Sequence, residues 1–333
     1  MRNLVQCAAF ILIFSWAVQA DQSASGGADP VPAAPDAFII GADISWVQQQ
    51  EDQGRKFKDN GVEKDIFQIL KDHGFNAIRL RIFHNPQSPK GYSKQGYCDL
   101  PHSLKMAKRI KKAGMIFLLD FHYSDNWADP GKQYKPLAWE NLPFDELVIA
   151  VGDYTKQVVA ALKDQGTPAD MVQIGNEISN GFLWPDGKLD DWDKFTALIK
   201  AGIRGVKEAD PNAAIMLHLA CGGQNKQSIN LMENLLSRHV EFDILGQSYY
   251  PKWHGTLDDL RSNLNDLAKR YKHDLILVEY SQCKREVNEI VRALPNKKGR
   301  GAFIWEPTQW GEPLFDRDGN TLPEIDLYRE FAK

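Results

Sequence analysis

Short apolar runs recur along this chain, and stretches with a different, helical spacing of apolar residues separate them. The runs are mostly continuous rather than alternating, which is typical of parallel strands that are covered on both faces. A chain with this pattern has few ways to bury its apolar side chains other than a parallel sheet covered by helices. We expect strands at residues 38–44, 76–83, 115–121, 171–178, 213–219, 242–249, 275–280 and 301–305.

Between these runs, apolar residues recur with the period of an amphipathic helix that buries one stripe. Gly74, Gly114 and Gly166 follow three of the intervening stretches, where helix stop signals belong. The clearest expected stripes are Val62, Ile66, Ile69 and Leu70; Val151, Tyr154, Val158 and Leu162; Phe195, Leu198, Ile199 and Val206; and Leu257, Leu260, Leu264 and Leu267.

Eight alternations of strand and helix favour a (β/α)8 barrel of the α/β class, the TIM barrel, over an open doubly wound sheet. No G-x-G-x-x-G motif follows any run, so a dinucleotide-binding fold loses its main support. Such barrels typically span ~250 residues, with loop insertions in addition. We therefore predict a single barrel domain over residues 36–333.

The first residues predict export from the cytoplasm. Arg2 precedes an apolar run over residues 4–18, and small residues follow it, which is typical of a signal peptide over residues 1–20. The run is shorter than the ~20 residues that a membrane span needs. Residues 21–35 are rich in Ala, Gly, Pro and Ser, and predict a flexible leader. We expect a secreted or periplasmic protein.

Charge and cysteine content narrow the candidate partners. The formal net charge is −4 and the chain has no long basic run, so neither nucleic acid nor a membrane is expected as a partner. After the signal peptide, Cys98, Cys221 and Cys283 remain, which allows one disulfide at most. Their scattered spacing disfavours a zinc site. We expect no metal, no cofactor and a monomer.

Polar residues gather at the ends of the apolar runs, where the active sites of such barrels lie. Glu177 ends the fourth run and Glu279 ends the seventh. Each glutamate alone could be an ordinary ion-pair partner. Together, at one barrel mouth, they indicate the carboxyl pair of glycoside cleavage, in which one group protonates the leaving oxygen and the other attacks the anomeric carbon.

With these residues the sequence resembles family 53 of the glycoside hydrolases, the arabinogalactan endo-β-1,4-galactanases. The resemblance implies a retaining enzyme on a TIM barrel that cleaves β-1,4-galactan. The Asn176–Glu177 pair alone would indicate only the larger clan of such barrels, whereas the long run from Leu118 through Gln133 is specific to the family. The matching stretches, which extend over nearly the whole chain after the leader, are residues 41–45, 77–81, 118–125, 127–133, 173–177, 247–251, 278–280 and 305–307.

The resemblance also implies roles for single residues. Glu177 is the expected acid/base and Glu279 the expected nucleophile, while Asn176 binds the sugar 2-hydroxyl. Tyr249 and Arg81 are expected to keep the nucleophile ionised, because hydrogen-bond donors and cations lower the pKa of a carboxyl.

Five further residues are expected to contact substrate. Asp43, His122, Trp127, His218 and Trp305 end strands or begin the loops that follow them. For His122, a supporting hydrogen bond beside the site is an equal alternative to sugar contact.

One arginine and one loop segment are expected to take no direct part in the site. Arg79 is expected to be structural and to point away from Arg81. The short segment over residues 281–300 predicts that a calcium site, which longer versions of this loop carry in some bacterial relatives, is missing.

Two other functions remain open at this point. A mannanase or xylanase of the same clan would share both glutamates. A non-catalytic polysaccharide-binding barrel is disfavoured, because Arg81, Asn176, Tyr249 and the two glutamates are all retained.

Overall fold

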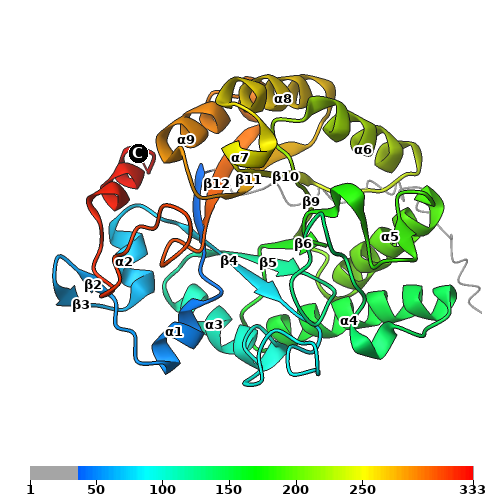
Figure 1. Cartoon of the computed structure of the whole chain (residues 1–333), viewed down its shortest axis with the longest axis horizontal. Helices are drawn as coiled ribbons and strands as arrows, with labels where there is room; N and C mark the ends of the chain where they lie inside the picture. The colour runs from blue at the N-terminus through cyan, green and yellow to red at the C-terminus, as the bar shows by residue number, and fades with distance from the viewer. Residues whose placement is uncertain (1–36, 333) are drawn as a thin grey trace, which may run out of the picture. The chain divides into compact units, whose positions relative to one another are not determined.

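The computed structural model describes residues 37–332, and a closed barrel of parallel strands forms the centre of this region (Figure 1). Neighbouring strands pair in parallel, and the last barrel strand pairs with the first. The predicted fold class is confirmed, and a strand lies in each of the eight expected runs, although the fourth strand ends at Ile174 and not at residue 178. The barrel strands are β1 (Ile39–Asp43), β4 (Ala77–Ile82), β5 (Ile116–Phe121), β6 (Met171–Ile174), β9 (Ala214–Leu219), β10 (Ile244–Tyr249), β11 (Asp274–Tyr280) and β12 (Gly299–Trp305).

Helices surround the barrel and cover the outer face of its sheet (Figure 1). They bury the apolar stripes that the helical spacing predicts, and Val151, Val158 and Leu162 of α4 are fully buried. The helices are α1 (Val47–Asp52), α2 (Ile66–Asp72), α3 (Leu100–Lys112), α4 (Phe144–Asp164), α5 (Trp192–Ala209), α6 (Asn225–Ser237), α7 (Pro251–His254), α8 (Leu257–Arg270) and α9 (Lys284–Arg292), with 3-10 turns η1 (Leu137–Trp139), η2 (Ile178–Asn180), η3 (Pro295–Lys297) and η4 (Pro323–Glu330).

One residue of the first expected helix lies elsewhere. Val62 is in the small hairpin of β2 (Lys58–Asp59) and β3 (Val62–Glu63), and its side chain is 60% exposed. The helix begins only at Ile66, because the side chain of Asp65 accepts a hydrogen bond from the main-chain nitrogen of Phe67 and caps it. The interpretation of Val62 as part of a helical stripe was wrong. A second hairpin is formed by β7 (Gly181–Phe182) and β8 (Gly187–Lys188).

The inside of the barrel is divided along its axis. Its amino-terminal part is apolar, with Leu118, Met216, Ile276, Val278 and Phe303 among the residues of a compact cluster. Towards the carboxyl ends of the strands the inward side chains become polar. These buried polar side chains include Asp43, Arg79, Asp120, Gln173, His218 and Glu279. A polar barrel mouth above an apolar floor is where this fold places chemistry.

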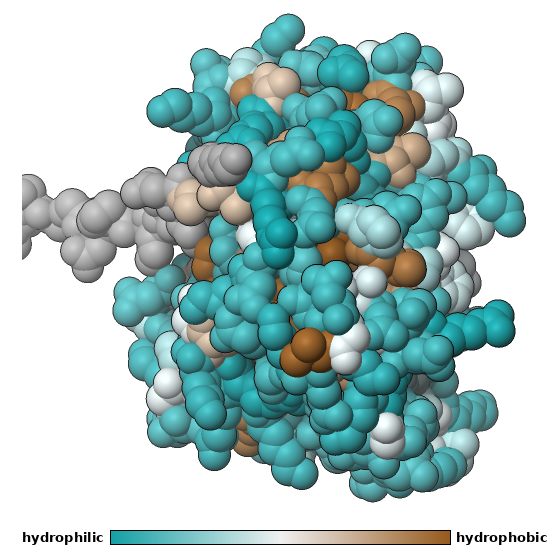
Figure 2. Space-filling view, turned by 90° about the vertical axis from the view of Figure 1, so that its left-hand side faces the viewer, coloured by the Kyte–Doolittle hydropathy of each residue, from teal (hydrophilic) through white to brown (hydrophobic). Residues whose placement is uncertain are grey.

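The outer surface is largely hydrophilic on the face shown in Figure 2, where hydrophobic side chains are separated from one another. Among residues 37–332, no helix is both long and apolar enough to cross a membrane. The expected signal peptide over residues 1–20 and the expected leader over residues 21–35 lie outside the described residues.

Candidate active site

Glu177 and Glu279 line the same pocket at the barrel mouth, which has a volume of about 180 Å³. Glu279 lies within β11, and Glu177 follows β6 after a sharp turn. In that turn Gly175 has φ 79° and Glu177 has φ 50°, so two left-handed residues redirect the chain immediately after the strand. A side chain at position 175 would also clash, because an added Cβ would lie 2.6 Å from Ile178.

Arg79 is the central cation of this site. Its guanidinium donates hydrogen bonds to Asp43 at 3.0 Å, to Asp120 at 2.8 Å and to Glu279 at 3.2 Å. A further hydrogen bond reaches Oδ1 of Asn176 at 2.8 Å. Burial opposes the charge on Arg79, but the surrounding carboxylates outweigh this effect and raise the pKa of the guanidinium. Arg79 therefore remains charged and connects Glu279 to Asn176.

The expected contact between Arg81 and Glu279 was wrong. Residues two apart on a strand share a face, so Arg79 and Arg81 both point into the barrel, and Arg79 is the one beside Glu279. Arg81 instead donates a hydrogen bond to Glu306 at 2.5 Å, and its guanidinium lies 4.2 Å from the ring centre of Trp127.

The expected contact between Tyr249 and Glu279 was also wrong, because the neighbouring Tyr250 makes it. Tyr250 Oη donates a hydrogen bond to Oε1 of Glu279 at 2.7 Å, whereas Tyr249 Oη donates to the main-chain oxygen of Gly255 at 3.0 Å. Ser248 faces inward, paired with Glu279 in the sheet and 2.7 Å from His218. Side chains alternate along a strand, so Tyr249 points out into the layer beneath the helices and Tyr250 points in.

The two glutamates have different surroundings. Burial, together with the nearby charge of Glu279, raises the pKa of Glu177 to about 8. Burial also raises the pKa of Glu279, but Arg79 and the hydrogen bond from Tyr250 oppose this rise. Hydrogen bonds and cations favour the ionised form of a carboxyl, so Glu279 is the more readily ionised of the two.

Asn176 is held in one orientation from both ends of its amide. Its oxygen accepts from Arg79, and its nitrogen donates to the main-chain oxygen of Ala128 at 2.9 Å. His218 supports it from behind, with Nδ1 3.0 Å from Oδ1 of Asn176. Burial lowers the pKa of His218 well below its ordinary value, so this ring is neutral.

His122 is fixed in a similar way. Its Nε2 lies 3.1 Å from Asp120, and its Nδ1 accepts from the main-chain nitrogen of Ala128 at 3.0 Å. The ring nevertheless lines the pocket, so the expected supporting role and sugar contact are both compatible with its position.

Tryptophan rings form one wall of the pocket. Trp127 and Trp305 both line it, with 6.0 Å between their ring centres, and Trp46 packs 5.5 Å from Trp305. Arg81 lies beneath this wall together with Glu306, which is fully buried and accepts from Arg81 and from the main-chain nitrogen of Trp46.

Of the expected site residues, His218 and Tyr249 do not line the pocket, and the other eight do. Arg79, Tyr250 and Glu306 were missed. The expectation that Arg79 points away from Arg81 was wrong, because both arginines lie on the inward face of β4. Alternation from the inward Ser248 would have indicated Tyr250, and the place of Glu306 directly after the last expected strand, within the matching stretch 305–307, was its available signal. The eight residues brought together are Asp43, Arg81, His122, Trp127, Asn176, Glu177, Glu279 and Trp305.

Cys98, Cys221 and Cys283 are free thiols. The sequence allowed one disulfide at most among them, and none is formed. Within residues 37–332, no group of three or more His, Cys, Asp or Glu side chains is arranged to hold a metal ion.

Comparison with known proteins gives the family. The model of glycosyl hydrolase family 53 matches residues 39–285. The endo-β-1,4-galactanase of Bacillus subtilis is 34% identical over 81% of this chain and 70% of that protein. An arabinogalactan endo-β-1,4-galactanase of Humicola insolens is 32% identical over 80% of this chain and 88% of that protein.

Solved structures agree with this result. The family 53 catalytic domain of Ignisphaera aggregans superimposes with a TM-score of 0.83 and 36% identity, covering 92% of this chain and 99% of that domain. The chain therefore belongs to glycosyl hydrolase family 53 and is a glycoside hydrolase.

Proposed function

We propose that this chain is an endo-acting, retaining glycoside hydrolase that cleaves β-1,4-galactan, the main chain of type I arabinogalactan. One observation carries the mechanism: two buried glutamates share a pocket, and their surroundings differ. Arg79 and Tyr250 both donate hydrogen bonds to Glu279, whereas burial raises the pKa of Glu177 to about 8. Pairs of titratable groups whose environments separate their pKa values identify the acid and the base.

In the first step, ionised Glu279 attacks the anomeric carbon and protonated Glu177 donates its proton to the departing glycosidic oxygen. The bond to the leaving sugar breaks and a glycosyl ester with Glu279 forms. In the second step, Glu177, now ionised, removes a proton from water, and the water oxygen displaces Glu279 from the anomeric carbon. Asn176, held by Arg79 and Ala128, presents its amide nitrogen beside this centre and hydrogen-bonds the sugar 2-hydroxyl.

Other site residues bind the sugar without reacting. Trp127 and Trp305 offer flat apolar surface, and the C–H faces of a sugar ring can pack on it. Asp43 is bound to Arg79 and to Ser45, so its contribution is to hold Arg79 in position as much as to contact substrate.

The identity of the polysaccharide rests on the relatives. Two proteins that align with four-fifths of this chain are named for β-1,4-galactan, which supports the same substrate here. A mannanase or xylanase of related fold would share the paired glutamates, so the chemistry of the pocket alone does not favour one sugar. A barrel that only binds polysaccharide does not explain why two carboxyl groups are buried in one pocket, an arrangement that is costly unless it is used.

The deciding experiment is a reducing-sugar assay on debranched β-1,4-galactan, with mannan and xylan in parallel and with product sizing. We expect new reducing ends with galactan, products of intermediate length early in the digestion, and no release by Glu279→Gln. Release from mannan or xylan at a higher rate than from galactan would contradict the proposed substrate. Absence of release from all three would contradict an enzyme of this class.

We further propose that the protein is secreted or periplasmic and acts as a monomer. The signal-like sequence over residues 1–20 supports export. Cell fractionation with amino-terminal sequencing of the mature protein tests this, and a mature chain that retains residues 1–20 would contradict it. Light scattering at working concentration tests the monomer.

A further inference from the structure

Glu306 is a buried acid that the proposed mechanism does not use. It directly follows Trp305, the last residue of β12, and its side chain is fully buried. It does not line the catalytic pocket, so it does not touch the sugar. A buried carboxyl group is costly unless it is hydrogen-bonded or used. An acid in this place therefore needs partners, a function or both.

The backbone of Glu306 has an unusual conformation. Its φ angle is 46°, in the left-handed region that residues other than glycine rarely adopt. Its main-chain nitrogen donates to the main-chain oxygen of Asp43 at 3.0 Å, and its main-chain oxygen accepts from the nitrogens of Gln309 and Trp310 at 3.1 and 3.0 Å. Outliers of this kind gather at functional sites, where the surrounding structure holds them.

The side chain of Glu306 fixes Arg81. Nη1 of Arg81 donates a hydrogen bond to Oε1 of Glu306 at 2.5 Å, whereas Oδ1 of Asp43 lies 3.8 Å from the same nitrogen. Nε and Nη2 of this guanidinium are buried and have no hydrogen-bond partner among residues 37–332. Glu306 therefore supplies the short hydrogen bond that determines where the guanidinium lies.

Three aromatic rings lie around the guanidinium of Arg81. Its central carbon is 4.2 Å from the ring centre of Trp127, 5.4 Å from that of Trp46 and 5.5 Å from that of Tyr92. A guanidinium over an aromatic face is attracted by the ring quadrupole, and more strongly when both are out of water. Arg81 thus connects the carboxyl group of Glu306 to the ring of Trp127.

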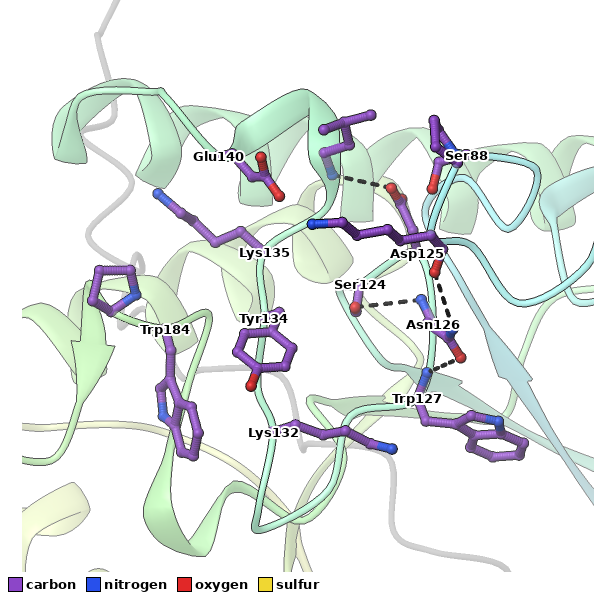
Figure 3. Close-up of a pocket in the computed structure, with 14 residues that line it drawn as sticks. Ser88, Ser124, Asp125, Asn126, Trp127, Lys132, Tyr134, Lys135, Glu140 and Trp184 are labelled. Atoms are coloured by element: carbon purple, nitrogen blue, oxygen red, sulfur yellow. Dashed lines mark hydrogen bonds between the residues drawn. The ribbon is translucent and has the colours of Figure 1, made fainter.

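Trp127 faces the substrate side of this arrangement. It follows β5 and lines both the catalytic pocket and the neighbouring cavity of about 690 Å³ (Figure 3). Its main-chain nitrogen donates to the side-chain oxygen of Asn126 at 2.8 Å, which fixes the backbone but not the ring. The ring itself packs on Arg81, with ring centres 6.1 Å from Trp46 and 6.0 Å from Trp305. We call Trp46, Trp127 and Trp305 the tryptophan wall.

Glu306 also holds the tryptophan wall directly, at Trp46. Its Oε1 accepts from the main-chain nitrogen of Trp46 at 3.1 Å, so the same oxygen bonds both Trp46 and Arg81. Burial raises the pKa of Glu306 to about 8, and Arg81 opposes this rise. Oε1 can accept both hydrogen bonds in the neutral and in the ionised form. The position of this oxygen, rather than its charge, is therefore what the wall depends on.

We propose that Glu306 is a positioning residue for sugar binding, whose side-chain oxygen holds the tryptophan wall in place through Arg81 and through the backbone of Trp46. The inference rests on the proposed function. Rings that pack on the sugar do so in the bound substrate and in the transition state alike, so their displacement should raise KM and change kcat much less. This separates Glu306 from Arg79, which contacts the nucleophile.

Steady-state kinetics on galactan tests the role of the oxygen. Glu306→Ala should raise KM about tenfold with kcat within about threefold of the wild type, because the stacking rings lose their support. Glu306→Gln should restore most of the wild-type KM, since its amide oxygen can accept the same two hydrogen bonds. An unchanged KM in Glu306→Ala, a kcat loss larger than the KM rise, or equal KM values for the two variants overturns the proposal.

Glu51→Ala is the matched control. Glu51 also pairs with a buried part of an arginine, at 2.5 and 2.9 Å from the guanidinium nitrogens of Arg109, but it does not line the catalytic pocket. This variant should keep the wild-type KM and kcat. A KM rise as large as that of Glu306→Ala would show a general effect of losing a glutamate and overturn the proposal.

A double-mutant cycle tests the route through Arg81. Glu306→Ala, Arg81→Met and the double variant should each raise KM by about the same tenfold factor, rather than multiplying to about 100-fold, because all three interrupt one connection. The double variant leaves neither charge of the pair unpaired, so it provides the test if Glu306→Ala does not fold. Effects that multiply, or a wild-type KM in the double variant, overturn the proposal.

Tryptophan fluorescence tests the wall without any turnover. Glu306→Ala should shift the emission to longer wavelength and increase quenching by acrylamide, because displaced rings meet more water, and Glu51→Ala should do neither. Unchanged emission and quenching in Glu306→Ala overturn the proposal. If the wild-type protein does not hydrolyse galactan but the emission shifts as expected, the proposed function fails, and Glu306 still positions the wall.

Discussion

Arg79 donates a hydrogen bond from Nη1 to Oε2 of Glu279, with 3.2 Å between the two atoms. The same guanidinium holds the amide oxygen of Asn176, so one buried cation positions both the candidate nucleophile and the group that would bind the 2-hydroxyl. Asp43 and Asp120 in turn hold the guanidinium in place. The site is therefore a connected network rather than a set of independent side chains.

Replacing Arg79 should damage the chemical step. Arg79→Lys keeps the charge but cannot donate to Asp43, Asp120, Asn176 and Glu279 at once, so kcat should fall by roughly 100-fold. Arg81→Lys is the matched control, because Arg81 contacts Glu306 and the tryptophan wall instead. Its main expected effect is a higher KM. Steady-state kinetics on galactan, with circular dichroism to verify folding, distinguishes the two, and a larger kcat loss from Arg81→Lys would contradict this assignment.

Tyr250 and Tyr249 make a second matched pair. Tyr250→Phe removes the hydroxyl that donates to Glu279, so kcat should fall by about tenfold or more. The acidic limb of the pH profile should move to higher pH, because loss of a donor raises the pKa of Glu279. Tyr249→Phe removes only a bond to the main chain of Gly255 and should have a much smaller effect. Equal effects of the two variants on kcat would show that the hydroxyl of Tyr250 is not used.

Variants of the two glutamates should be defective in different steps of the reaction. Glu279→Gln and Glu177→Gln should each lose most activity on galactan while retaining the wild-type melting temperature, since amides replace the carboxyls with little change of volume. Near-normal turnover by either variant would contradict its assignment.

With an aryl galactoside that has a good leaving group, Glu177→Ala should still form the glycosyl-enzyme but release it slowly. A burst of the aryl product followed by slow turnover is the expected signature. An absence of the burst would place Glu177 elsewhere in the mechanism.

The pH dependence of kcat/KM should have its basic limb near pH 8. Glu177 must be protonated to act as the acid, and burial raises its pKa to about 8, so activity should be lost as the pH rises through that value. The same shift should lower the free energy of unfolding as the pH rises from the ordinary carboxyl pKa of 4.5 to about 8, because only the folded state still holds the proton in that range. Above pH 8 this loss should level off. A pH–rate profile and melting curves from about pH 4 to 10 test both statements. A flat profile up to pH 9.5 would contradict the role of Glu177.

Cleavage should retain the anomeric configuration. Retaining enzymes hold their two carboxyl groups ~5–5.5 Å apart, whereas inverting enzymes leave ~6.5–9.5 Å for a water molecule. Glu177 and Glu279 line one pocket, and we expect the shorter separation between their carboxyl groups. Proton NMR of an early digest should show the β-anomer first. Initial appearance of the α-anomer would mean that Glu279 is not a nucleophile, and the roles given to Arg79 and Tyr250 would fail with it.

The barrel could be predicted from the sequence because its evidence is local. Each strand is a short apolar run, each helix has an apolar stripe, and both periods are visible within a few residues. Glu177 and Glu279 could be identified for the same reason, since each ends such a run and the fold directs strand ends to one mouth.

The sequence did not determine the contacts between side chains that are distant along the chain. Arg79 and Arg81 share a face of β4, and only their positions along the barrel axis determine that Arg79 contacts Glu279 and Arg81 contacts Glu306. Tyr250 points inward because it lies two residues after Ser248, and the inward direction of Ser248 is evident only from its pairing with Glu279 and its contact with His218. The sequence by itself determined the periodicity and the strand-end residues. The tertiary structure decided which cation and which hydroxyl reach Glu279, because that choice depends on how neighbouring strands are aligned.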